Sequence, residues 1–325
     1  LWYETEEEAL KGKEMALSFS LSGVWRFLRV PNPEAVPEGF EKEDYACRGW
    51  DTIRVPSQIE LSGYGHPQYT DTDYPWDGRE TVKPHDIPRE ENPTGCYVKT
   101  FSLPEEMVGK RLQLHLEGVE TAFHCWINGS YVGYSEDSYT PAVFDIPEKV
   151  RAGENKIALE VYRFSSGSWL EDQDFWRMGG IIRDVTVRAL PEIHIRDLDV
   201  QAYLTEDYTC GEARIRVKLD GTKAEGAKIV WKLYDARIRM DEPEEETCIL
   251  SGEEALPDQE EKTAEISFQI PEVKSWSAEV PWLYRLVAAA LDGQGRTIEA
   301  VGQDVGFRKV EIRDNILYFN GRRLR

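Results

Sequence analysis

The fold class is set by the stretch Arg111-Leu112-Gln113-Leu114-His115-Leu116-Glu117, in which apolar and polar residues alternate strictly. Successive side chains of a β-strand point to opposite faces, so this period of two predicts a strand with one buried and one solvated face. Residues 156–162 repeat the pattern. Asn128-Gly129, between the strand-like runs 123–127 and 130–134, tolerates the positive φ values of a two-residue hairpin turn. The chain is therefore predicted to be an all-β protein of short strands, folded as a sandwich.

Two domains are predicted from the length of 325 residues and from a break near Pro191. Residues 4–17 are expected to form a short helix at the start of the first domain. About six or seven strand-like runs follow Pro191 within about 115 residues, the size of an immunoglobulin-like sandwich, although the Cys-Trp-Cys core of antibody domains is missing. The expected runs are 193–200, 213–219, 229–234, 264–270, 284–291 and 298–305. The expected domains are residues 1–191, residues 192–308 and a hairpin over residues 309–325 with an Asn320-Gly321 turn.

Charge and cysteine usage exclude several functional classes. The chain has 60 Asp and Glu but only 39 Lys and Arg, which gives a net charge of −21. This charge repels phosphate backbones and anionic lipid, so no nucleic-acid or membrane partner is expected. Five widely spaced cysteines without a Cys-x-x-Cys pair indicate neither a disulfide framework nor a zinc site, and free thiols favour the cytoplasm. No apolar run has the length of a membrane span. Because the sequence begins at Leu1 rather than Met, the lack of a signal peptide is weak evidence against export of the protein.

A second stretch is unusually rich in charge and aromatic rings: Trp169-Leu170-Glu171-Asp172-Gln173-Asp174-Phe175-Trp176-Arg177-Met178-Gly179-Gly180, followed by an apolar run to Val185. A core strand would not tolerate these charges, because a buried unpaired charge costs several kcal/mol. A disordered linker would not carry two Trp. Carboxylates beside aromatic faces suit a sugar, whose hydroxyls form hydrogen bonds and whose C–H faces stack on rings. The alternative is a charged surface loop anchored by its tryptophans, and chemistry alone favours neither.

This stretch resembles the characteristic loop of the bacterial β-galactosidases of glycoside hydrolase family 2. Other motifs of the family follow in its order, at residues 91–97, 116–124, 128–138, 151–155, 276–284, 305–312 and 319–321. The ordered set covers nearly the whole chain. The resemblance implies a jelly-roll (galactose-binding-like) domain, an immunoglobulin-like domain and then a (β/α)₈ barrel. A barrel takes roughly 250 residues, so only its lead-in is expected after Phe307.

The implied activity is retaining hydrolysis of terminal β-D-galactosides such as lactose, with Mg²⁺ and Na⁺ (or K⁺) in the parent enzyme. Retaining glycosidases need two carboxyl groups about 5–5.5 Å apart, and in this family both are Glu on the barrel. No catalytic residue is therefore expected in this chain, which alone should be inactive. Asp172 and Asp174 would lie about 7 Å apart on one strand face, without an opposing partner, and do not make a substitute pair.

Asp174 aligns with a family aspartate that reaches into the barrel's active site, where it binds galactose hydroxyls and a monovalent cation. A carboxylate suits this role, because hard cations prefer oxygen ligands. Asp172 and Trp176 are weaker substrate-binding candidates, expected mainly to hold the loop in place. The loop's arginines, Arg177 and Arg183, are expected to pair with Glu171, Asp172 or Asp184.

A second sugar contact of the family meets a departure in this sequence. Relatives place an Asn or Asp before a Pro in the segment matching residues 74–88, but Lys83 stands there, so the contact is lost or shifts to Asp77 or Asp86. The turn before the characteristic loop, residues 165–168, lacks the acid with which some relatives bind a divalent ion, so that site is not predicted. His124, on a predicted strand, is expected to be a hydrogen-bonded sandwich residue.

Two alternatives to the β-galactosidase remain open at this point. In the first interpretation the chain is part of a larger enzyme, whose partners are its own catalytic barrel and a galactoside, and which could form a homo-oligomer. The first alternative is a stand-alone carbohydrate-binding or adhesion module. Another family 2 activity, such as that of a β-glucuronidase, shares the same architecture. A C-terminal hairpin without partner strands favours the larger enzyme.

Overall fold

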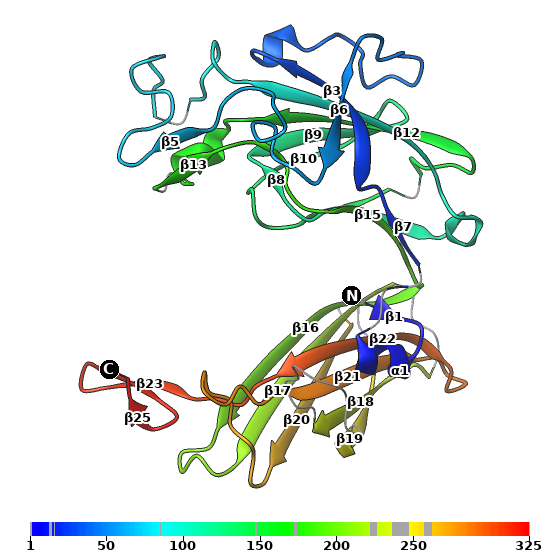
Figure 1. Cartoon of the computed structure of the whole chain (residues 1–325). Coiled ribbons are helices and arrows are strands. Elements are labelled where there is room, and N and C mark those ends of the chain that lie inside the picture. The colour runs from blue at the N-terminus through cyan, green and yellow to red at the C-terminus, as the bar shows by residue number, and fades with distance from the viewer. Residues whose placement is uncertain are drawn as a thin grey trace. The chain divides into compact units, whose positions relative to one another are not determined.

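The computed structural model describes residues 2–12, 15, 17–84, 86–146, 148–171, 174–221, 226–235, 247–256 and 262–324. They form two compact units, one of residues 17–190 and one that joins the first 16 residues to the part after Leu190 (Figure 1). Among the described residues one α-helix and three short 3₁₀ turns accompany the strands, so the all-β prediction is confirmed. None of the described helices is long and apolar enough to cross a membrane.

The first unit is a sandwich of a six-stranded and a four-stranded sheet. The first sheet has the order β10 (Ser130–Glu136), β9 (Ala122–Ile127), β12 (Glu154–Tyr162), β6 (Thr94–Ser102), β3 (Gly23–Val30), β4 (Asp51–Val55). The second has the order β11 (Ala142–Asp145), β7 (Arg111–Leu116), β15 (Val185–Leu190), β2 (Ser18–Ser20). The leucines of β7 are buried and its polar residues half-buried, as the alternation predicted. They join Trp25, Phe27 and Tyr97 in the core.

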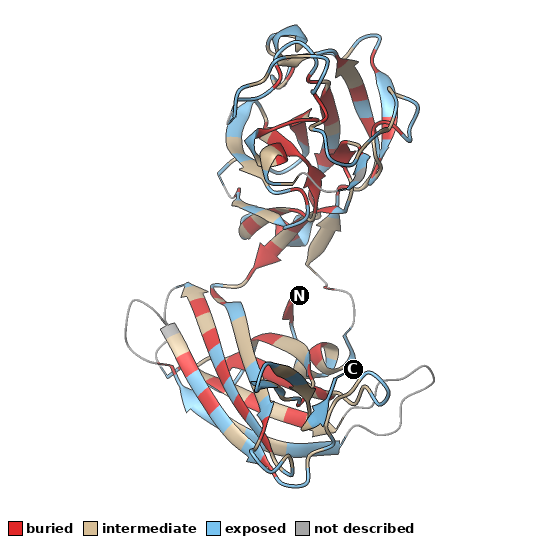
Figure 2. Cartoon of the chain, turned by 90° about the vertical axis from the view of Figure 1, so that its left-hand side faces the viewer, coloured by how far each residue is buried: buried red, intermediate tan, exposed pale blue. Residues whose placement is uncertain are grey.

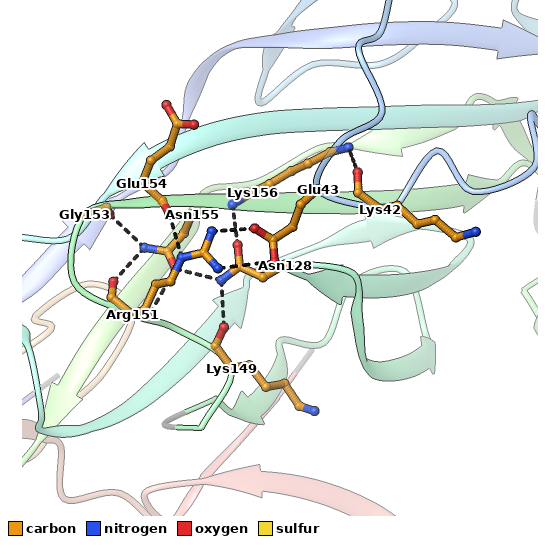
Figure 3. A network of polar contacts seen from close by, with 9 residues as sticks. All are labelled: Lys42, Glu43, Asn128, Lys149, Arg151, Gly153, Glu154, Asn155 and Lys156. Atoms are coloured by element: carbon orange, nitrogen blue, oxygen red, sulfur yellow. Dashed lines mark hydrogen bonds and ion pairs between the residues drawn. The ribbon is translucent and has the colours of Figure 1, made fainter.

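The predicted Asn-Gly hairpin is present, and it is tied down by a polar network (Figure 3). Asn128 and Gly129 have φ of 50° and 74°. The Asn128 amide donates to the carbonyl of Lys149 and to Oδ1 of the buried Asn155, at 2.9 and 2.8 Å. Asn155 in turn donates to the carbonyls of Arg151 and Gly153. The family motifs at residues 128–138 and 151–155 therefore meet in one place, where they stabilise turns.

Buried residues also alternate with exposed or half-buried ones along several strands of the second unit, most regularly along β17 (Gly211–Gly221) (Figure 2). One sheet has the order β1 (Trp2–Tyr3), β22 (Thr297–Val305), β21 (Tyr284–Leu291), β18 (Lys228–Asp235), β19 (Thr247–Ala255), and the other β16 (Ile193–Leu204), β17 (Gly211–Gly221), β20 (Lys262–Ile270). All six predicted runs are strands. Sequence reasoning missed β19, whose residues are mostly exposed and do not alternate between apolar and polar types.

The N-terminal residues belong to the second unit, whereas the sequence analysis placed them in the first domain. Strand β1 pairs antiparallel with β22, with Trp2 opposite Val301, and both residues of β1 are buried. The helix α1 (Glu6–Lys11) is shorter than the expected 4–17, because Thr5 caps its start and Gly12 ends it with φ of 61°. The guanidinium of Arg285 donates to the carbonyl of Ala9, which joins α1 to the same sheet.

The C-terminal segment, predicted as one hairpin, forms a sheet of three short strands in the order β23 (Val310–Arg313), β24 (Ile316–Phe319), β25 (Arg322–Arg323). The predicted Asn320-Gly321 turn is confirmed, with φ of 47° and 74°. A second turn, at Asp314-Asn315, also has positive φ.

Candidate functional site

The characteristic loop of the first unit is positioned by two short strand pairs. Strand β13 (Phe175–Arg177) pairs with β5 (Gln68–Thr70), and β14 (Gly180–Ile181) pairs with β8 (Val119–Glu120). In the first pair Trp176 lies opposite Tyr69. Asp174 directly precedes β13 and is exposed. The pairing of β13 with β5 therefore holds this carboxylate at the protein surface.

Asp174, Tyr69 and Trp176 form an exposed cluster, called here the Asp174 platform. The Tyr69 hydroxyl donates a 2.5 Å hydrogen bond to Asp174 Oδ1. The rings of Tyr69 and Trp176 lie 5.6 Å apart between centroids, and both residues are more than half exposed, at 53% and 56%. The platform therefore presents a carboxylate beside two aromatic rings, the combination that suits a sugar.

Electrostatics keep Tyr69 in its donating form. Its hydrogen bond to the Asp174 carboxylate raises the pKa of the phenol, and the Asp174 charge raises it further. The phenol therefore stays protonated across the physiological range and restricts the orientation of the carboxylate.

On the C-terminal side of the platform, the loop is fixed by a buried ion pair. Arg163 Nη1 lies 3.4 Å from Glu60 Oε1, and the two side chains are only 9% and 2% exposed. Glu60 Oε2 accepts the backbone N–H of Gly179 at 2.9 Å, and Arg163 donates to the carbonyl of Arg177 at 3.0 Å. These bonds give each charge a partner and attach the loop to the sandwich at Arg177 and Gly179, while Arg163 Nε stays buried without a hydrogen-bond partner among the described residues.

The loop's other charged residues differ in part from the expected ion pairs. Glu171 accepts from the backbone N–H and the hydroxyl of Ser138 at 3.1 and 3.0 Å. Arg183 donates instead to the carbonyls of Tyr139 and Glu117, and Asp184 accepts from the Ser22 hydroxyl. The buried guanidinium of Arg177 donates to the carbonyl of Glu171 at 3.0 Å and to the hydroxyl of Thr70 at 3.2 Å. Asp172 lies outside the described residues.

A further carboxyl group lies buried near the loop's base. Glu120 is only 7% exposed, and burial raises its pKa to about 8, with the charges of Glu60 and Glu171 adding to the rise and those of Arg163 and Arg177 opposing it. Glu120 is thus largely protonated at neutral pH. Sequence reasoning missed this residue because nothing in its local pattern marks it as buried among charges.

The second predicted contact segment meets the loop through Trp169. The indole N–H of Trp169 donates to the carbonyl of Asp86 at 2.7 Å. The rings of Tyr74 and Trp76 lie 4.5 and 4.8 Å from that of Trp169. Lys83, Asp77 and Asp86 are all exposed.

Within this segment, the Asp77 carboxylate accepts the backbone N–H of Tyr74 at 3.0 Å, so it stabilises a turn. The structure therefore brings Asp86 to the loop by its backbone and gives Asp77 a local structural contact. His124, the predicted sandwich residue, forms a 2.9 Å hydrogen bond with the Tyr131 hydroxyl, as expected.

Within the described part of the chain, no group of three or more His, Cys, Asp or Glu side chains could hold a metal ion. Asp174 offers one carboxylate, of which one oxygen accepts from Tyr69. Its oxygens fit a hard cation as one ligand of several, and further ligands would have to come from elsewhere.

Two family models match the chain. Residues 19–191 match the sugar binding domain of the glycosyl hydrolases family 2, and residues 193–308 match a second domain of the same family. The chain belongs to glycosyl hydrolases family 2. This agrees with the resemblance inferred from the ordered motifs.

Curated relatives align along nearly the whole chain. A β-galactosidase of Halalkalibacterium halodurans is 42% identical over 324 residues, which cover 100% of this chain and 31% of the relative. Those of Priestia megaterium and Streptococcus thermophilus are 39% and 38% identical, and each alignment covers 99% of this chain and 31% and 30% of the relative. The chain thus spans about a third of the length of these relatives.

Solved structures share the fold at lower identity. A calcium-binding mutant of β-glucuronidase 2 from Bacteroides uniformis superimposes with a TM-score of 0.72 at 18% identity, over 94% of this chain and 34% of that one. A family 2 member from Bacteroides cellulosilyticus gives 0.71 at 20% identity, over 95% and 39%. At such identities the likeness shows the fold of family 2 and does not distinguish substrates.

Proposed function

We propose that this chain supplies the sugar-binding and immunoglobulin-like domains of a retaining β-galactosidase that hydrolyses terminal β-D-galactosides such as lactose. The observation that carries the proposal is the 35–42% identity, over nearly the whole chain, to proteins named β-galactosidase. In this proposal both catalytic carboxyl groups lie outside the chain, on a barrel that is the main partner of these domains. The chain's share of about a third of its relatives' length is consistent with this arrangement.

In this proposal Asp174 binds substrate. Its carboxylate accepts hydrogen bonds from galactose hydroxyls while Tyr69 holds one of its oxygens, and the exposed ring of Trp176 offers an apolar face to the sugar. The carboxylate is also one oxygen ligand for Na⁺ or K⁺, a cation that would help fix the sugar hydroxyls. Mg²⁺ would be held outside this chain. The five free cysteines support a reducing compartment, the cytoplasm, and homo-oligomers are expected of the whole enzyme.

The role of Asp174 is tested by Asp174→Ala in the full-length protein. Losing a charged hydrogen-bond acceptor is expected to lower kcat/KM for a chromogenic β-galactoside by about ten- to a hundredfold. Asp73→Ala, at an exposed aspartate between β5 and the Tyr74 turn, is the matched control and should leave kcat/KM unchanged. Equal kinetics of Asp174→Ala and wild type would refute the assignment.

Measurements of turnover and galactose binding on this chain by itself distinguish the proposed role from that of a stand-alone binding module. We expect no turnover of a chromogenic β-galactoside and no measurable galactose binding, because the catalytic pair and most of the subsite lie outside it. Galactose binding with micromolar affinity in a calorimetric titration would favour the binding module.

A further inference from the structure

A cleft of about 400 Å³ opens in the first unit, beside the end of β3, strand β5 and the segment before β6. Four prolines provide apolar walls, and three arginines, Arg29, Arg79 and Arg163, line it together with Gln68. Successive residues of a strand face opposite sides. Gln68 therefore faces the cleft while its neighbour Tyr69 faces the Asp174 platform, so the two sites lie on opposite faces of β5.

Two of the three arginines have carboxylate partners. Arg163 pairs with Glu60, and Arg79 Nη1 lies 3.4 Å from Glu91 Oε2. Burial lowers the pKa of Arg163, Glu60 opposes this shift, and the charges of Arg29 and Arg79 lower the pKa further, so both of these guanidinium groups lie close enough to repel that of Arg163.

Arg29 is the exception among them. It is half-buried, its Nε is fully covered without a hydrogen-bond partner, and no ion pair joins it to a carboxylate among the described residues. Its guanidinium packs over Gly65, where an added Cβ would lie 3.4 Å from Nε and Nη2. The remaining acid of the cleft, Glu90, is solvent-exposed. A partly desolvated guanidinium without an anion is unfavourable, so the cleft carries one positive charge that no described carboxylate pairs with.

We propose that this cleft binds a sugar acid, a pyranose with one carboxylate, and that the carboxylate pairs with Arg29. A guanidinium binds a planar carboxylate through two parallel hydrogen bonds, which a hydroxyl cannot reproduce. The side-chain oxygen of Gln68 is available to a sugar hydroxyl, because its amide N–H₂ donates to the carbonyl of Pro75 at 2.8 Å. The proline walls suit the C–H edges of the ring, and the volume lies at the lower end of the range for small-molecule sites. The proposal does not rest on the β-galactosidase assignment.

The test is calorimetric titration of the chain with sodium glucuronate and sodium galacturonate at constant ionic strength. At least one should bind, and galactose, which lacks the carboxylate, should bind at least about tenfold more weakly. Arg29→Gln should weaken binding of the sugar acid by about ten- to a hundredfold. Arg26→Gln is the matched control, because Arg26 is exposed and three residues earlier on the same strand, hence on its other face, and it should leave binding unchanged.

Three results of the titration would overturn the proposal: no heat from either sugar acid up to about 10 mM, equal binding by Arg29→Gln and wild type, or equally tight binding of acetate. Arg29→Lys guards against misfolding, since it keeps the charge but loses the paired hydrogen bonds, and its affinity should lie between those of wild type and Arg29→Gln. A structure of the full-length protein with one of its own carboxylates against Arg29 would also contradict the proposal, by replacing the ligand with a contact inside the protein.

Discussion

The characteristic loop has two parts with opposite physical character. At its base, Arg163 and Glu60 form a buried ion pair, which also bonds to the backbone of Arg177 and Gly179. At the Asp174 platform, two exposed rings and an exposed carboxylate contact one another at the protein surface. Buried charges must be paired for the fold to survive, whereas exposed groups add little to stability and are free to meet a ligand. The base should therefore govern folding and the platform binding.

The largest expected effect is at the base. Arg163→Ala leaves the Glu60 carboxylate buried without its partner and should lower the unfolding free energy of the first unit by about 3–5 kcal/mol. Hydrogen exchange of the β6 and β12 amides measures this unit separately from the second. Arg79→Ala, which breaks the exposed pair with Glu91 in the same unit, is the control and should have an effect below about 1 kcal/mol. A similar loss in both variants would contradict the contrast between buried and exposed charges.

The second-largest expected effect is a dependence of the first unit's stability on pH, caused by Glu120. Its pKa is about 8 in the folded state against 4.5 for the ordinary value, so the folded state holds a proton that the unfolded state loses between these pH values. Stability of the first unit should therefore fall as pH rises from about 4.5 to 8, by up to a few kcal/mol, and this contribution should be constant above and below that window. Glu120→Gln should remove this slope. A slope unchanged in that variant would show that other groups cause it.

The smallest effect is expected at the platform. Tyr69→Phe removes the hydroxyl that orients Asp174 and should lower kcat/KM of the full-length protein about three- to tenfold, with no change in the stability of the first unit. Tyr203→Phe, at an exposed tyrosine of the second unit, is the control. If Tyr69→Phe instead destabilised the unit, the platform would belong to the structural base.

Local alternation predicts most of the strands because burial on one face imposes it, as the leucines of β7 show. It does not predict β19, whose residues are mostly exposed, or the place of β1, which depends on a pairing between Trp2 and Val301. The same limit applies to the site. The sequence alone indicates the chemistry of Asp174 and Trp176. Tyr69 reaches Asp174, and Glu60 reaches Arg163, only after folding brings these distant residues together.

The return of the N-terminus to the second unit makes the first unit an insertion. Residues 17–190 interrupt one sandwich, and they enter and leave it at adjacent points, since the N–H of Ala189 donates to the carbonyl of Leu17 at 3.0 Å and β2 pairs with β15. Close termini make a domain separable from its host and open to circular permutation. A deletion of residues 1–16 would consequently damage the immunoglobulin-like sandwich, nearly 300 residues away in sequence, and leave the neighbouring sugar-binding sandwich intact.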